Sequence, residues 1–117
     1  MNLLIPTTSK KRNRIIGIYG LYCSTTKMWY VGASTDVLRR VHNHLYEMSD
    51  VPLSMTKLCV AGREHGVNKF TPILLEETQD VSRLRLLELE WQTKLNSKDN
   101  GYNSQASGDS RFWEEEN

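Results

Sequence analysis

GIYGLYCSTTKMWYVG, residues 17–32, is the stretch that decides the fold. Its two halves belong to expected strands over residues 15–22 and 28–33, which are short and rich in β-branched and aromatic side chains. A polar break separates them, so together they predict a β-hairpin. Side chains alternate between the two faces of a strand, and a tight turn around Ser24 and Thr25 would make Tyr19 and Tyr30 cross-strand neighbours.

The residues after the hairpin predict a helix from about 36 to 48, capped by Ser34 or Thr35. Arg40 and His44 are one helical turn apart on the border of its apolar stripe. We therefore expect both side chains to emerge at the edge of the core rather than on the open face. The core-facing stripe of this helix consists of Val37, Val41, Leu45 and Met48.

Three further elements are expected. A second helix covers residues 54–65 and stops at Gly66. A third strand covers residues 70–75, and Pro72 places it toward a sheet edge or a strand start. A third helix runs from about residue 80 to 95. The inward residues are Met55, Leu58 and Ala61 or Gly62 in the second helix, and Val81, Leu84, Leu87, Trp91 and Leu95 in the third.

One acidic residue of the third expected helix, Glu88, lies on its apolar face rather than on its solvent-facing side. The helical wheel puts Glu88 on the apolar side, whereas Glu90 lies well away from it. A buried carboxylate is costly, so it is usually ion-paired, protonated or bound to a metal. Taken alone, Glu88 could simply pair with Arg85 or Arg40.

The length of 117 residues fits one domain, which we expect over residues 15–106 between a basic extension (1–14) and a short acidic tail (107–117). The charged share of 25% is normal for a globular protein. No run approaches the roughly 20 apolar residues that span a bilayer, and no signal-peptide core is present. A cytoplasmic location in a bacterial or phage-infected cell is expected, without secretion or membrane contact. The two cysteines and three histidines lack the spacing of a zinc site.

Charge is unevenly distributed along the chain. Ten basic and four acidic residues fall in residues 1–70, against five and ten in residues 71–117. The basic part suits a phosphate backbone, and the later carboxylates suit a metal or a solvated surface. The expected nucleic-acid contacts are Lys10, Lys11, Arg12, Arg14, Arg39 and Arg40.

Two triplets in the opening stretch carry a family resemblance. Gly17-Ile18-Tyr19 and Tyr30-Val31-Gly32 resemble the two signature strands of the GIY-YIG nuclease superfamily, with valine for isoleucine in the second triplet. Arg40 and His44 stand where the family carries an arginine and often a histidine, and Glu88 matches its metal-binding glutamate. Residues 95–103 closely resemble the end of the catalytic domain of phage intron-encoded homing endonucleases.

The resemblance implies an α/β fold of the α+β type, with a small three-stranded antiparallel sheet flanked by three or more helices. It also implies a metal-dependent DNA endonuclease of the phage or mobile-element homing type, with Mg²⁺ (or Mn²⁺) as cofactor and DNA as partner. The site residues that it implies are Tyr19, Tyr30, Arg40, His44, Glu88 and Asn103, with Glu88 as the metal ligand.

These residue types suit the hydrolysis of a phosphodiester, whose anionic oxygens repel a nucleophile. Glu88 can hold a single Mg²⁺ whose other ligands are waters and phosphate oxygens, and Arg40 can bind a non-bridging oxygen. Tyr19 is the expected general base, with Tyr30 orienting the water or a phosphate oxygen. A phenolate at Tyr19 would need positive charge from Arg40, from the metal or from a protonated His44; alternatively, His44 takes the proton from Tyr19 in a relay.

Two other functions are open on the sequence. One is a structure-specific or repair nuclease that acts on branched or damaged DNA, and the other is a catalytically silent nucleic-acid-binding module. Homing enzymes usually carry a separate DNA-recognition domain after the catalytic domain, whereas residues 104–117 alone follow Asn103 here. A homodimer or a separate targeting partner is then expected, unless the chain is a catalytic fragment.

Overall fold

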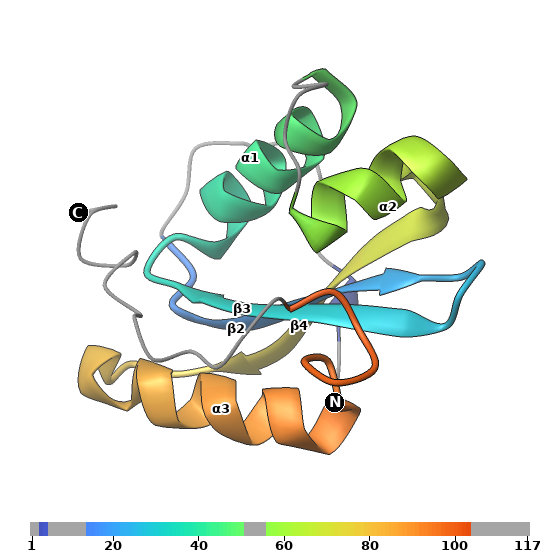
Figure 1. The fold of residues 1–117 in the computed structure, drawn as a ribbon. Coiled ribbons are helices and arrows are strands. Elements are labelled where there is room, and N and C mark those ends of the chain that lie inside the picture. Colours follow the sequence, from blue (N-terminus) through green and yellow to red (C-terminus); the bar gives the residue numbers. More distant parts are fainter. Residues whose placement is uncertain (1–2, 5–13, 51–55, 104–117) are drawn as a thin grey trace.

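A computed structural model describes residues 3–4, 14–50 and 56–103. At its centre is an antiparallel sheet in the order β1-β4-β2-β3, so that β3 forms one edge (Figure 1). The strands are β1 (Leu3–Leu4), β2 (Gly17–Cys23), β3 (Met28–Ser34) and β4 (Phe70–Glu77), and the helices are α1 (Val37–Asp50), α2 (Lys57–His65) and α3 (Leu84–Leu95), with 3-10 turns η1 (Val67–Lys69) and η2 (Val81–Arg83). The expected fold class is confirmed: three longer strands make the sheet, and the two-residue β1 extends it beside β4.

The β2–β3 hairpin forms as expected, but its register differs from a tight turn at Ser24 and Thr25. Four residues, 24–27, make the turn, and Lys27 adopts a left-handed conformation at φ 63°. Tyr19 therefore lies opposite Gly32, and Tyr30 lies opposite Leu21. The shift is two residues, so both phenols keep the same face of the sheet and become diagonal neighbours.

Helix α1 packs the predicted stripe against the sheet. Val37, Val41 and Met48 are buried, and Leu45 is partly buried against the same core. The predicted cap is wrong in detail, because the carboxylate of Asp36 accepts the hydrogen bond from the Arg39 backbone amide. Ser34 Oγ instead accepts from the Asp36 amide at 2.8 Å. The resulting turn directs α1 back over the sheet immediately after β3.

The helices cover both faces of the sheet. Helices α1 and α2 lie together on one face, and α3 lies on the other (Figure 1). Tyr19 and Leu21 point toward α1 and α2, whereas Ile18 and Val31 point toward α3. Within the part of the chain that the structure describes, no helix is long and apolar enough to cross a bilayer.

The ends of two predicted helices need correction. Helix α2 begins at Lys57, because the Thr56 side chain accepts a hydrogen bond from the Cys59 amide; the predicted start and Met55 lie outside the described residues. The third helix begins with η2, and Val81 in that turn is exposed rather than part of the stripe. A 3-10 turn has three residues per turn, so the α-helical wheel does not apply to it.

Candidate active site

Tyr19 and His44 form a direct pair beneath the surface. Tyr19 Oη and His44 Nε2 are 2.8 Å apart, joining β2 to α1. Tyr19 is 0% exposed and His44 6% exposed. The Tyr19 hydroxyl is therefore enclosed by the protein in this structure.

Tyr30 completes an aromatic cluster with this pair. Its ring centre lies 4.9 Å from that of His44 and 6.4 Å from that of Tyr19. Burial raises the pKa of Tyr30 to about 12, although a hydrogen bond to Tyr19 acts in the opposite direction. Tyr30 as a whole residue is partly exposed, in contrast to the fully buried Tyr19, and it keeps its proton at neutral pH.

The glycine of the second triplet makes room for the first tyrosine. A Cβ atom at position 32 would lie 2.5 Å from Tyr19 Oη and 2.6 Å from Tyr19 Cζ. The Tyr19 ring cannot turn away easily, because it is fully buried and bound to His44. The spacing of the two triplets thus has a steric reason: Gly32 faces Tyr19 across the hairpin.

We expect Gly32→Ala to lower the free energy of unfolding by about 1–3 kcal/mol, because overpacking forces side chains or backbone to shift. Urea unfolding measures the loss. In a Tyr19→Leu background, which lacks the phenol, the same substitution should cost clearly less. Equal costs in the two backgrounds would show that the Tyr19 ring is not what excludes the methyl group.

The environment keeps His44 uncharged. Burial, and then the positive charge of Arg40, lower the pKa of His44 to about 3. The ring is therefore neutral at physiological pH, and the expectation that a protonated His44 stabilises a phenolate is not met. Its hydrogen bond can instead hold the Tyr19 hydroxyl in place.

This pKa shift predicts acid sensitivity. The unfolded chain binds a proton at His44 below pH 6.5 while the folded chain does not, so stability falls as the pH falls from 6.5 toward 3. The loss is about 2 kcal/mol at pH 5 relative to pH 8. His44→Gln should remove this part of the pH dependence of urea unfolding, whereas His65→Gln, on α2, serves as the control. An unchanged pH slope in His44→Gln would refute the assignment.

Arg40 and Glu88 bring opposite charges to the same tyrosine. After burial, the charges of Arg40 and Glu88 are the next largest influences on the pKa of Tyr30: Arg40 lowers it and Glu88 raises it. Arg40 is partly buried on α1, and Glu88 is 3% exposed on α3, whereas Glu90 is exposed. The wheel-based distinction between the two glutamates is confirmed, and the predicted catalytic types converge around Tyr30.

The Glu88 carboxylate fits a divalent cation. It is buried, and its Oε1 atom accepts no hydrogen bond in the structure, although the residue has other interactions. Among the described residues no group of three or more His, Cys, Asp or Glu side chains could hold a metal. A cation held by Glu88 would therefore have few protein ligands, which suits Mg²⁺ because that ion usually keeps several waters and adds substrate phosphates.

Asn103 binds the backbone of the edge strand. Its Oδ1 accepts from the Val31 amide at 2.9 Å, and its Nδ2 donates to the Val31 carbonyl, also at 2.9 Å. The Tyr102 amide donates to the Trp29 carbonyl. Residues 102–103 therefore supply the hydrogen bonds that a neighbouring strand would otherwise give to β3, directly beside Tyr30.

Two residues near the site were missed by the sequence analysis. Gln92 Nε2 donates to the Val31 carbonyl at 3.3 Å, and Lys57 Nζ donates to the carbonyl of Asn103 at 3.3 Å. Gln92 could have been found, because it lies one turn after Glu88 on the same buried side of α3. No sequence signal distinguishes Lys57 from an ordinary surface lysine at a helix start.

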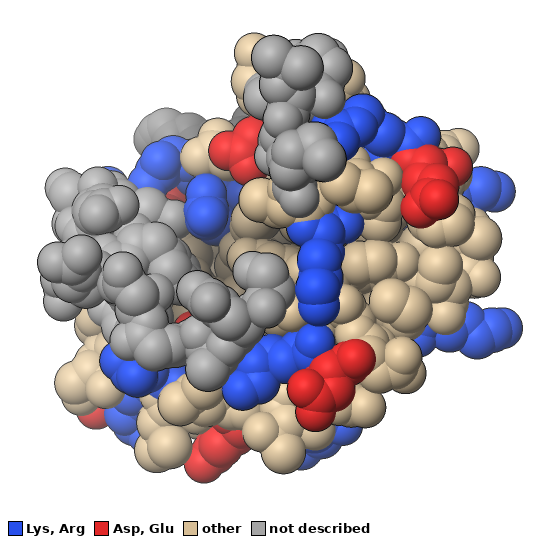
Figure 2. Space-filling view, viewed as in Figure 1, with Lys and Arg blue, Asp and Glu red and all other residues tan. Residues whose placement is uncertain are grey.

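Apart from Arg40, the predicted nucleic-acid contacts divide into two groups. Lys10, Lys11 and Arg12 lie outside the described residues. Arg14 and Arg39 are exposed and gather at the start of α1, where both approach the Asp36 carboxylate, at 3.9 and 3.6 Å. Figure 2 shows basic side chains with acidic ones between them, rather than a uniformly positive face.

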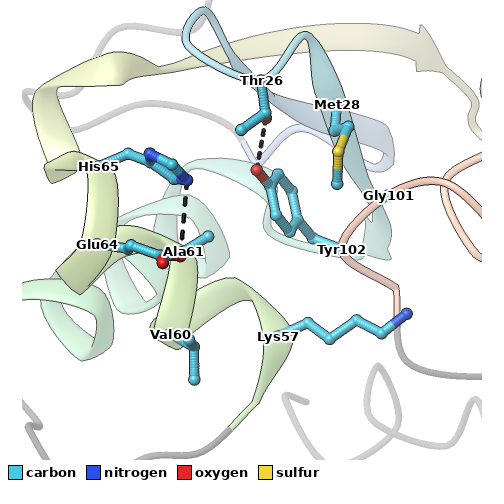
Figure 3. A pocket seen from close by; sticks show the side chains of 9 residues that line it. All are labelled: Thr26, Met28, Lys57, Val60, Ala61, Glu64, His65, Gly101 and Tyr102. Carbon is cyan, nitrogen blue, oxygen red and sulfur yellow. Dashed lines mark hydrogen bonds and ion pairs between the residues drawn. The ribbon is translucent and has the colours of Figure 1, made fainter.

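A cavity of about 390 Å³ lies apart from the catalytic cluster, between the hairpin turn and α2 (Figure 3). Its lining includes none of the six predicted catalytic residues. Tyr102 lines it, with its hydroxyl hydrogen-bonded to Thr26, as does the stem of Lys57. The cavity thus adjoins the segment that carries Asn103 but does not form part of the site.

Comparison with known proteins agrees with this geometry. The model of the GIY-YIG catalytic domain matches residues 15–103. A point mutant of the catalytic domain of the intron endonuclease I-TevI is 30% identical with a TM-score of 0.70, and the match covers 79% of this chain and 95% of that one. A structure of the catalytic domain of the homing endonuclease I-TevI is 31% identical with a TM-score of 0.69, covering 77% and 98%. No curated protein matches the sequence. The chain belongs to the GIY-YIG family of endonucleases and carries its catalytic domain.

Proposed function

We propose that this protein is a homing-type endonuclease that hydrolyses phosphodiester bonds of double-stranded DNA, depends on Mg²⁺ or Mn²⁺, and leaves a 5′-phosphate. The observation that carries the proposal is the convergence on Tyr30 of a second phenol, a guanidinium and a buried carboxylate. The homing role is supported by the two I-TevI domains, which resemble this chain over more than three quarters of its length.

The two phenols divide the proton transfer between them. Tyr30 is the more exposed of the two tyrosines and keeps its proton, so we assign its hydroxyl to the attacking water. Tyr19 is hydrogen-bonded to Tyr30 and is fully buried behind it. As the water loses a proton to the Tyr30 oxygen, Tyr30 passes its own proton to a phenolate at Tyr19. Tyr19 thus remains the final proton acceptor, and Tyr30 both orients the water and relays the proton.

His44 holds Tyr19 rather than storing the proton. With the pKa of His44 at about 3, because of burial and Arg40, transfer from an ordinary phenol is uphill by roughly 7 pKa units, on the order of 10 kcal/mol. We therefore assign the proton to Tyr19 rather than to His44, with Arg40 as the positive charge near the cluster.

Arg40 and Glu88 deal with the charge of the phosphate. Arg40 can donate to a non-bridging oxygen, where negative charge grows as the water attacks. Glu88 would hold the divalent cation, which when bound neutralises phosphate charge and makes a water more acidic. Without a cation, the Glu88 carboxylate would repel the phosphate, so a carboxylate in this place favours a metal-dependent reaction.

Cleavage assays test the proposal. Purified protein is incubated with supercoiled plasmid and Mg²⁺, with and without EDTA. We expect nicked and linear products carrying 5′-phosphate ends, and no product in EDTA. Undiminished cleavage in EDTA, or intact plasmid at every Mg²⁺ and Mn²⁺ concentration, would contradict it. Labelled linear duplex, flap and four-way junction substrates of equal length, compared in parallel, separate a homing-type nuclease from one that recognises branched DNA.

A further inference from the structure

The metal-binding glutamate and the phenols approach the site from opposite faces of the sheet. Tyr19 and Tyr30 pack with α1 and α2, whereas α3, which carries Glu88, packs on Ile18 and Val31 of the other face. The two sets of groups meet at Tyr30, on the edge strand β3. The position of the Glu88 carboxylate relative to Tyr30 therefore depends on how α3 is fixed to that edge.

Gln92 makes a polar connection between α3 and β3. It is 2% exposed and lies one helical turn after Glu88. Its Nε2 donates to the Val31 carbonyl, the same oxygen that accepts from Asn103 Nδ2. Val31 is the residue next to Tyr30, so this oxygen is a common anchor for α3 and for the 102–103 segment beside the reacting phenol.

Hydrophobic packing does not explain why residue 92 carries an amide side chain. The core between α3 and the sheet is apolar, with Val31, Leu84 and Leu87 among its buried residues, and an apolar side chain would bury there more favourably than an amide. A buried amide loses hydration and must be compensated by hydrogen bonds with defined directions. Such bonds fix a helix along its axis, which apolar contacts do less well because they tolerate sliding.

We propose that Gln92 is a positioning residue for the endonuclease: it ties α3 to the Val31 carbonyl and thereby sets the Glu88 carboxylate against Tyr30. This inference rests on the proposed function, since it concerns the geometry of that same site. Because Gln92 is buried, we assign it no contact with DNA or with the reacting atoms. Its loss lets α3 settle differently on β3, and a shift of about 1 Å in a reacting group can cost on the order of a hundredfold in rate.

The test compares Gln92→Met, which keeps the length and volume of the side chain but not the amide, with Gln79→Met, the same exchange at an exposed position. We expect Gln92→Met to lower kcat by about tenfold or more, to raise the Mg²⁺ concentration for half-maximal cleavage, and to leave the KM for DNA unchanged. Gln79→Met should resemble wild type. A purely structural role would lower the thermal midpoint without changing the Mg²⁺ dependence of the folded protein.

Binding of Mn²⁺ to the DNA-free protein, followed by the relaxation of water protons, gives a readout independent of cleavage. Gln92→Met should bind Mn²⁺ more weakly than wild type, with Glu88→Gln as the reference for lost binding. Unchanged Mn²⁺ affinity together with unchanged Mg²⁺ dependence overturns the inference, and so does failure of both Gln92→Met and Gln92→Leu to fold. If wild type binds Mn²⁺ through Glu88 but cleaves no DNA, the proposed function fails while the Mn²⁺ comparison still decides the role of Gln92.

Discussion

Replacing Glu88 by glutamine should reduce Mg²⁺-dependent cleavage by about three orders of magnitude, which is at the upper end of what removal of one charge-stabilising group costs. The two side chains have nearly the same shape, so the buried position on α3 stays filled. What is lost is the negative charge that we propose holds the cation.

Glu90→Gln is the matched control for this prediction. Glu90 lies two residues further along the same helix, but its side chain is exposed. Plasmid nicking rates for the two variants are measured over a range of Mg²⁺ concentrations, with circular dichroism to show that both are folded. A Glu88→Gln protein that cleaves at the wild-type rate would remove Glu88 from the metal site.

Tyr19→Phe should lower the cleavage rate by about 10²–10⁴-fold, the range over which general base catalysis usually contributes. The ring stays in its buried place against the core, and only the hydroxyl that pairs with His44 and Tyr30 disappears. Because Tyr19 is 0% exposed, it cannot contact DNA, so the Kd for a duplex should stay within about twofold of wild type.

Two further tyrosine variants show whether a loss of cleavage in Tyr19→Phe is due to the proton relay. Tyr30→Phe should lose a similar amount of activity, since it breaks the relay at its first step. Tyr46→Phe, on α1 with 61% of its side chain exposed, should cleave normally. Full activity of Tyr19→Phe beside an inactive Tyr30→Phe would mean that Tyr30 passes the proton elsewhere, and the relay to Tyr19 would be wrong.

The sequence predicted the hairpin and the shared face of the phenols, but not their register. A register shift by an even number of residues leaves each side chain on the same face of the sheet. The turn has four residues instead of two, which shifts the register by two, so the two phenols still share a face. Turn length depends on local hydrogen bonds, such as that from the Lys27 amide to the Cys23 carbonyl, and residues 24–27 lack a strong turn signal.

Burial of the site residues followed partly from helical periodicity. On α3, the helical wheel correctly separated the buried Glu88 from the exposed Glu90. On α1, it placed His44 beside the apolar stripe, and three of the four residues of that stripe are deeply buried. It could not reveal that Tyr19 is completely enclosed, since that depends on contacts between α1 and β2. The wheel also places Gln92 one turn after Glu88 on the buried side of α3, but only the tertiary structure shows its hydrogen bond to the Val31 carbonyl.

The most direct test of the account is whether a cation held at Glu88 lies beside the phenols of Tyr19 and Tyr30. Mn²⁺ is titrated into the protein with a short DNA duplex, and the broadening of tyrosine ring signals is followed by NMR. We expect the signals of Tyr30 and Tyr19 to broaden first, those of Tyr46 to stay sharp, and the effect to vanish in Glu88→Gln. Broadening that spares Tyr30 and Tyr19, or that persists in Glu88→Gln, would contradict a single site assembled around the edge of β3.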